Sequence, residues 1–61
     1  MNIELLSIEQ IFDLANAGQT DILNQELMYS VYLQALALDS GYQDLFHELV
    51  DYSNLIQSNL S

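Results

Sequence analysis

Residues 21–39, DILNQELMYSVYLQALALD, decide the fold, because they are apolar nearly all round when drawn as an α-helix. One predicted face consists of Leu23, Leu27, Met28, Val31, Ala35 and Leu38. A second apolar face, on the opposite side, consists of Tyr29, Tyr32, Leu33 and Leu36. Only a narrow strip is polar, and its residues are Glu26, Ser30 and Gln34. The pattern predicts a helix that is covered on more than one side.

A chain of 61 residues contains too little other protein to cover both apolar faces. It has no cysteine, so neither a disulfide nor a thiolate metal site can stabilise it. A scaffold this small then depends on tight packing or on self-association. We therefore expect a homodimer or an obligate partner, with an interface formed by Tyr29, Tyr32, Leu33 and Leu36.

The segment before residue 21 predicts a short helix over residues 8–17. Ser7 and Gln10 have the spacing of a capping box, which begins a helix. Gly18 can supply the left-handed residue that ends it. The predicted core face consists of Ile8, Ile11, Phe12 and Ala15.

A third helix is predicted over residues 42–57, with Ser40 and Gln43 as a second capping box. Gly41 could instead be a kink within one long helix, and the sequence leaves this alternative open. The apolar stripe of this segment consists of Tyr42, Leu45, Phe46, Leu49, Tyr52, Ser53, Ile56 and Leu60. We expect an all-α fold, a small bundle of two to three helices in a single domain over residues 1–61, completed by dimerisation.

The charge of the chain is entirely of one sign. It contains no Lys or Arg and nine Asp or Glu, for a formal net charge of −9, whereas ordinary domains mix both signs. Nucleic-acid backbones and membrane-surface helices both require cationic side chains, so direct binding to either is not expected. No apolar run approaches the roughly 20 residues of a membrane span. These properties predict a soluble, cytoplasmic protein.

The most distinct acidic surface is predicted on the third helix. Asp44, Glu48 and Asp51 are spaced i, i+4 and i+7, which places three like charges on one face. A solvated face that keeps the protein soluble is the plainer interpretation. The exclusion of every basic residue favours a second one, in which this face, with Glu26 and Asp39, binds a basic surface of a protein target.

Catalysis and metal binding are not expected. His47 lies between Asp44 and Asp51 on the same face, but a zinc site needs three or four ligands of fixed geometry. Without Cys, Lys, Arg or a Gly-rich loop, nothing is available to stabilise a developing anion. We therefore expect no catalytic residue, no metal and no cofactor.

In composition the chain resembles phage-encoded anti-restriction and anti-CRISPR proteins, which are small and acidic and lack enzymatic motifs. That resemblance implies an inhibitor that occupies a basic, nucleic-acid-binding type of surface on its target. Its carboxylates would then lie where phosphates otherwise bind.

Residues 6–14, LSIEQIFDL, carry a second resemblance. They are similar to the opening of the NblA family, small proteins of cyanobacteria and red-algal plastids that promote phycobilisome degradation. The resemblance implies a dimeric adaptor with a short helix followed by a long one. The family's basic residues near the end of the long helix have no counterpart here, so their role in phycobiliprotein binding is not carried over.

Overall fold

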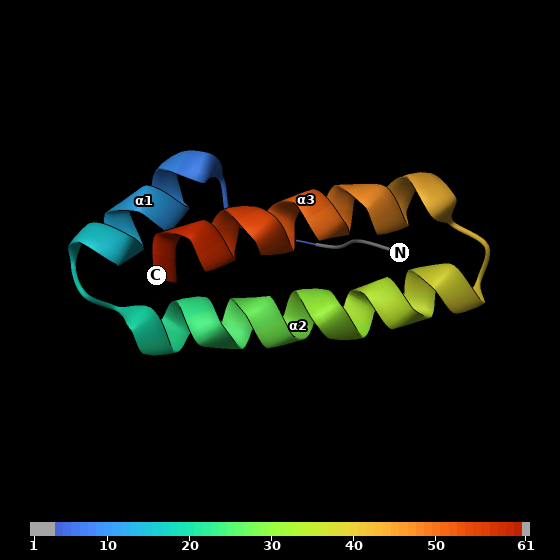
Figure 1. The fold of residues 1–61 in the computed structure, drawn as a ribbon, viewed down its shortest axis with the longest axis horizontal. Helices are drawn as coiled ribbons and strands as arrows, with labels where there is room; N and C mark the ends of the chain where they lie inside the picture. Colours follow the sequence, from blue (N-terminus) through green and yellow to red (C-terminus); the bar gives the residue numbers. More distant parts are fainter. Residues whose placement is uncertain (1–3, 61) are drawn as a thin grey trace.

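The computed structural model describes residues 4–60, which form three α-helices and no strand. The helices are α1 (Ile8–Asn16), α2 (Thr20–Asp39) and α3 (Gln43–Leu60). Helices α2 and α3 form an antiparallel hairpin, and the short α1 packs at one end of it (Figure 1). The molecule is elongated, with extents of 36 × 17 × 15 Å. The all-α prediction is confirmed.

Helix α1 begins and ends as its sequence predicts. The Ser7 hydroxyl accepts a hydrogen bond from the Gln10 N–H at 3.1 Å, and the Gln10 side chain accepts one from the Ser7 N–H at 2.9 Å. At the other end Gly18 has a φ of +73°. There the Gln19 N–H donates to the Leu14 carbonyl at 2.9 Å, which completes a Schellman motif.

The turn between α2 and α3 is a second Schellman motif. Gly41 has a φ of +80°, and the Tyr42 N–H donates to the Ala37 carbonyl at 2.8 Å. The alternative of one long kinked helix is therefore wrong. The second capping box is wrong as well, because Ser40 caps the C-terminus of α2 with its N–H and helix α3 begins only at Gln43.

The helix ends differ from the predicted bounds by one to three residues. Helix α2 starts at Thr20, one residue before the predicted segment, and no side chain caps its N-terminus. Helix α3 continues to Leu60, three residues beyond the predicted end at 57. Packing explains the extension, because Leu60 contacts the core cluster next to α1.

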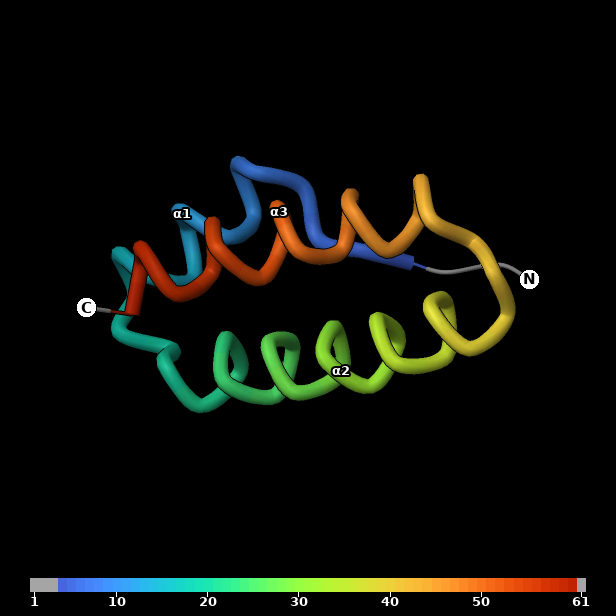
Figure 2. The backbone as a smooth tube through the Cα atoms, turned by 45° about the vertical axis from the view of Figure 1, so that its right-hand side comes forward, coloured from blue at the N-terminus to red at the C-terminus, as the bar shows by residue number. Residues whose placement is uncertain are grey.

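The core consists of two apolar clusters along the hairpin. Where α1 packs, the buried residues are Ile11, Leu23, Tyr52 and Ile56. Nearer the α2–α3 turn they are Leu33, Ala37 and Leu49. Figure 2 shows why only the first cluster includes α1, since this helix does not reach the turn.

A polar seam of Ser30, Gln34 and Ser53 lies within the hairpin, between α2 and α3. The hydroxyls of Ser30 and Ser53 are 2.7 Å apart, and both residues are buried. The Ser30 hydroxyl also contacts the Leu49 carbonyl at 3.1 Å, and the Gln34 amide donates to Ser53 at 2.7 Å. Every buried side-chain polar atom among the described residues has a partner, which makes this burial tolerable.

The polar seam determines how α2 is rotated about its own axis, and this rotation differs from the predicted assignment of its faces. Because Ser30 and Gln34 point at α3, the two apolar faces lie to either side and outward. Leu33 is 4% exposed and packs in the hairpin, so its assignment to an uncovered interface is wrong. Met28, Val31 and Leu38, which belong to the first predicted apolar face, are exposed.

Helix α1 shows a similar rotation. Ile11 is buried and Ala15 packs against the same cluster, as predicted. Ile8 and Phe12 are exposed, although the predicted core face included them. Leu14 takes their place against the cluster, which shifts the buried stripe by part of a turn.

We predict that Leu33→Ala lowers the free energy of unfolding by about 2–5 kcal/mol, as expected for a leucine removed from a core. Leu38→Ala is the matched control, because it makes the same change on the same helix at a side chain that is 60% exposed. Urea denaturation followed by circular dichroism measures both. Equal losses would contradict the assigned rotation of α2.

We predict that Gly41→Ala destabilises the protein by about 1 kcal/mol, because Ala at positive φ is strained. An added Cβ at this position meets nothing within 4 Å, so the loss reports the backbone alone. Gly41→Asn should cost less, since Asn tolerates this conformation better. In a continuous helix Gly41→Ala would be stabilising, and a higher melting temperature would refute the turn.

Candidate functional site

The structure exposes Asp44, Glu48 and Asp51 together along α3, as the spacing predicts. Asp39, at the end of α2 beside the turn, is also exposed. The chain contains no Lys or Arg that could pair with them. We call Asp44, Glu48 and Asp51 the acidic face of α3, and all three carboxylates are open to an external cation.

Glu26 is less exposed to solvent than the three residues of the acidic face of α3. It is half-buried, and its Oε2 accepts a hydrogen bond from the Tyr52 hydroxyl at 3.1 Å. The same hydroxyl accepts a hydrogen bond from the Leu6 N–H at 3.0 Å. Tyr52 therefore ties the segment before α1 to both helices of the hairpin, a role that no local sequence pattern indicates.

The environment of Tyr52 changes its proton affinity. Burial raises the pKa of its hydroxyl above the ordinary value of 10.0, and the hydrogen bond and charge of Glu26 raise it further. The backbone hydrogen bond from Leu6 acts in the opposite direction. The net effect keeps the hydroxyl protonated and able to donate to Glu26.

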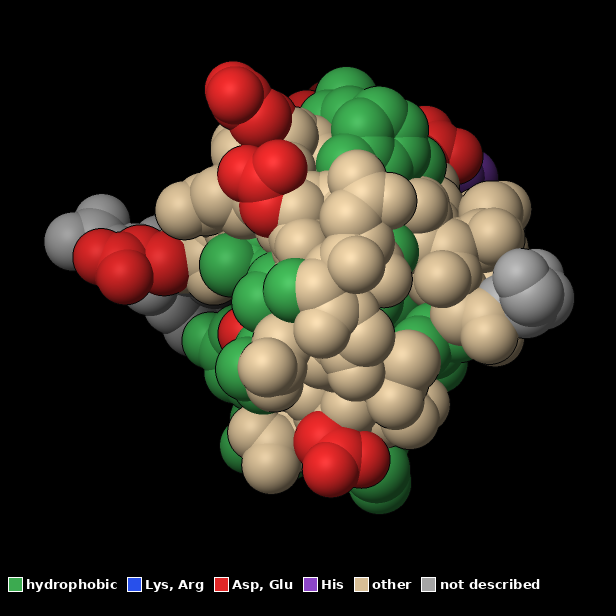
Figure 3. Space-filling view, turned by 90° about the vertical axis from the view of Figure 1, so that its left-hand side faces the viewer, with side chains coloured by type: hydrophobic (Ala, Val, Ile, Leu, Met, Phe, Trp, Pro, Cys, Tyr) green, Lys and Arg blue, Asp and Glu red, His purple; other side chains and the backbone are tan. Residues whose placement is uncertain are grey.

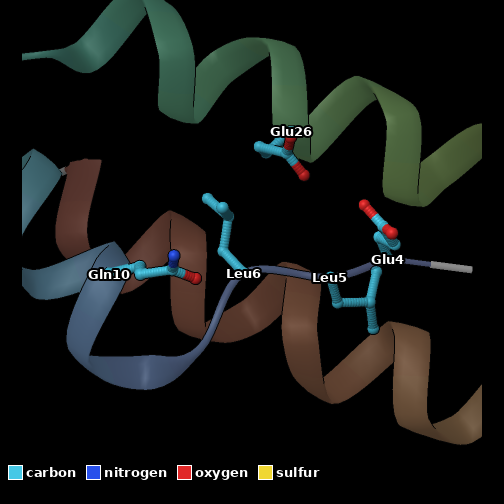
Figure 4. A pocket seen from close by; sticks show the side chains of 5 residues that line it. All are labelled: Glu4, Leu5, Leu6, Gln10 and Glu26. Carbon is cyan, nitrogen blue, oxygen red and sulfur yellow. The ribbon is translucent and has the colours of Figure 1, made fainter.

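A shallow pocket lies beside this contact, lined by Glu4, Leu5, Leu6, Gln10 and Glu26. In Figure 4 the side chains of Glu4 and Glu26 approach it from opposite sides, and Leu6 points toward α2. The lining offers two carboxylates and one amide, without a nucleophile and base pair. Over residues 4–60 no group of three or more potential metal ligands is found.

His47 is exposed on α3, and its ring contacts Phe46 edge-on, with ring centroids 5.7 Å apart. Its neighbours Asp44 and Asp51 are exposed as well. Exposed carboxylates on flexible side chains give no fixed geometry for a ligand or a proton transfer. The structure thus gives these residues a surface setting.

The second surface feature is an exposed apolar face of α2, and the sequence predicted only some of its residues. Figures 1 and 2 show α1 and α3 on the same side of α2, and no other part of residues 4–60 lies against its opposite side. We call the exposed residues there the outer face of α2: Met28, Tyr29, Val31, Tyr32, Ala35, Leu36 and Leu38. Three of the four predicted interface residues, Tyr29, Tyr32 and Leu36, belong to it.

The carboxylates lie elsewhere on the surface. Eight of the nine are exposed, Glu26 being the exception, and those of α2 stand near its two ends at Asp21 and Asp39. Figure 3, which views the end of the molecule where α1 meets α2, shows acidic groups spread around the rim without any cation. The outer face of α2 is therefore uncharged, and the negative charges lie on other parts of the surface.

We predict that Tyr52→Phe reduces the loss of stability at alkaline pH. A folded-state pKa above the unfolded value means that Tyr52 contributes stability fully below about pH 10, and that this contribution is lost as pH rises through the folded pKa. Melting temperatures between pH 8 and pH 11 measure the effect. The matched control is Tyr42→Phe, which makes the same change at a tyrosine that is 59% exposed and lies outside the outer face of α2. Identical slopes in all three proteins would contradict the role of Tyr52.

Comparison with known proteins adds no family. No protein-family description, curated protein or solved structure matches the chain. None of the helices within residues 4–60 has the length and apolarity needed to cross a membrane.

Proposed function

We propose that the protein is a non-catalytic inhibitor that covers a basic, nucleic-acid-binding type of surface on a cytoplasmic target protein. One observation supports this most. Eight of nine carboxylates are exposed, and the chain holds no Lys or Arg to neutralise them. Solubility alone needs no such exclusion, since mixed charges serve it as well.

The acidic face of α3 is the proposed contact. Its three carboxylates extend over about 10 Å of helix axis, at a rise of about 1.5 Å per residue. A helix in a packed hairpin fixes their backbone positions, so binding has to order only the side chains. The field of the whole chain adds long-range attraction, which speeds encounter with a cationic groove.

Self-association is the second part of the proposal. A hairpin whose seam is polar and whose outer side is apolar has more apolar surface than it can cover, so we propose that a homodimer completes the fold. The carboxylates of the acidic face of α3 stay exposed if the dimer forms through α2. One molecule can then form a homodimer through α2 and still bind its target through the acidic face of α3.

The adaptor role that the NblA resemblance implies receives less support. The resemblance implies a short helix followed by a long one, whereas residues 20–60 form two antiparallel helices joined at Gly41. The test below also separates the two roles, because capture of phycobiliproteins from a host lysate would favour the adaptor.

We predict that replacing Asp44 and Asp51 together by Lys weakens target binding about tenfold or more at low salt, since two attractive contacts become repulsive. The matched control is Glu9→Lys with Asp13→Lys on α1, where both residues are exposed and the net charge changes equally. The main protein retained from host lysate is purified and titrated with each variant at about 0.05 and 0.3 M salt.

Wild-type affinity should fall as salt rises, mainly through a slower association rate. The control should lose long-range attraction but keep the contact, and so weaken less. Equal weakening of the two double variants would show that only net charge matters. Affinity that responds to neither salt nor reversal would refute the inhibitor proposal.

A further inference from the structure

The outer face of α2 is a large uncovered apolar surface. Met28 is 74% exposed, Tyr32 61% and Val31 55%. With the other members of the face, the exposed area is on the order of 500–800 Å², taking large side chains at about 150–250 Å² each. The largest patch on a typical monomer is about 300–600 Å². We therefore expect another molecule to cover this face.

The charge distribution indicates which occupant fits. Between Asp21 and Asp39 the only charged residue of α2 is the half-buried Glu26, so the outer face itself is neutral. A basic partner would gain nothing from an apolar surface, because its cations would be desolvated without a counter-ion. A second copy presents the same neutral, apolar face and keeps its carboxylates outside the contact.

The area is also of the right size for a second copy. A stable interface buries about 800 Å² on each partner, which the outer face and its rim nearly supply. Helix pairs that meet through such faces pack at 8–10 Å between axes. The result is a dimer in which the two α2 helices pack against each other and lie between the two α3 helices.

We infer that the outer face of α2 binds the outer face of α2 in a second copy, with the two helices antiparallel across a two-fold axis near Tyr32. This inference rests on the self-association proposed above and is independent of the inhibitory role. It replaces the predicted interface, because Leu33 belongs to the hairpin core.

The orientation follows from the acidic ends of α2. Parallel packing would place Asp21 against Asp21 and Asp39 against Asp39 of the second copy. Antiparallel packing about Tyr32 instead places Asp39 opposite Gln25 of the second copy, since both lie seven residues from the axis. An amide can donate to a carboxylate, so this arrangement removes the like-charge contacts.

The first experiment compares masses by light scattering and sedimentation from about 5 to 200 μM. Wild type should reach twice the chain mass of 6.9 kDa. Tyr32→Glu should raise the dissociation constant about tenfold or more, because it places a charge at the axis. Asn54→Glu is the matched control, since it adds the same charge at an exposed site on α3. Circular dichroism checks that each variant is folded.

The second experiment uses the absence of cysteine, which makes any introduced thiol unique. Tyr32→Cys should form a disulfide-linked dimer under mild oxidation, since residues on the axis meet their own copies. Asn54→Cys should not. A helical variant that crosslinks at 54 and not at 32 would overturn the proposed face.

The outcomes distinguish the proposals. A wild type that is monomeric at 200 μM would refute both self-association and the face. If Tyr32→Glu leaves the dimer unchanged, self-association is supported, but the outer face of α2 is not its interface. If the wild type is monomeric and Tyr32→Glu abolishes target binding, the target occupies the outer face of α2 and the second-copy inference is wrong.

Discussion

The hydrogen bonds of Ser30 to the Leu49 carbonyl and to Ser53 set the rotation of α2, and much of the structure depends on that rotation. Buried hydroxyls need partners, and here α2 and α3 supply them to each other. Once Ser30 faces α3, the helix has to present Met28 and Tyr32 to solvent, because they lie on the opposite side. A polar contact inside the hairpin thus determines which apolar residues remain for intermolecular packing.

The fold is stabilised without ion pairs from Lys or Arg, since the chain contains neither. Apolar clusters at both ends of the hairpin, two Schellman turns and the Tyr52 contact hold it together instead. Because the chain has no Lys or Arg to pair with them, the eight exposed carboxylates can act on another molecule. Their mutual repulsion is a cost that salt and a bound cationic surface both reduce.

Local signals predicted the helices well. The Ser7–Gln10 box and Gly18 bounded α1, and the exposed spacing of Asp44, Glu48 and Asp51 followed from the helical period. The burial of Leu33 could not be predicted, because α2 is apolar on most sides and its period does not select one face. Which side turns inward depends on Ser53 and Leu49, residues about 20 positions away. The hydrogen bond between Tyr52 and Leu6 could not be predicted either, because it also joins residues far apart in the sequence.

The contact between Leu6 and Tyr52 joins residues 46 positions apart, near opposite ends of the chain. During synthesis, α2 and α3 can pair across a turn of a few residues, but the first segment has to wait for Tyr52 before it is fixed. We therefore expect the α2–α3 hairpin to form before α1 docks. Until α1 docks, Ile11 cannot cover Leu23 and Ile56, so a hairpin formed first would expose this apolar cluster to water and to other chains.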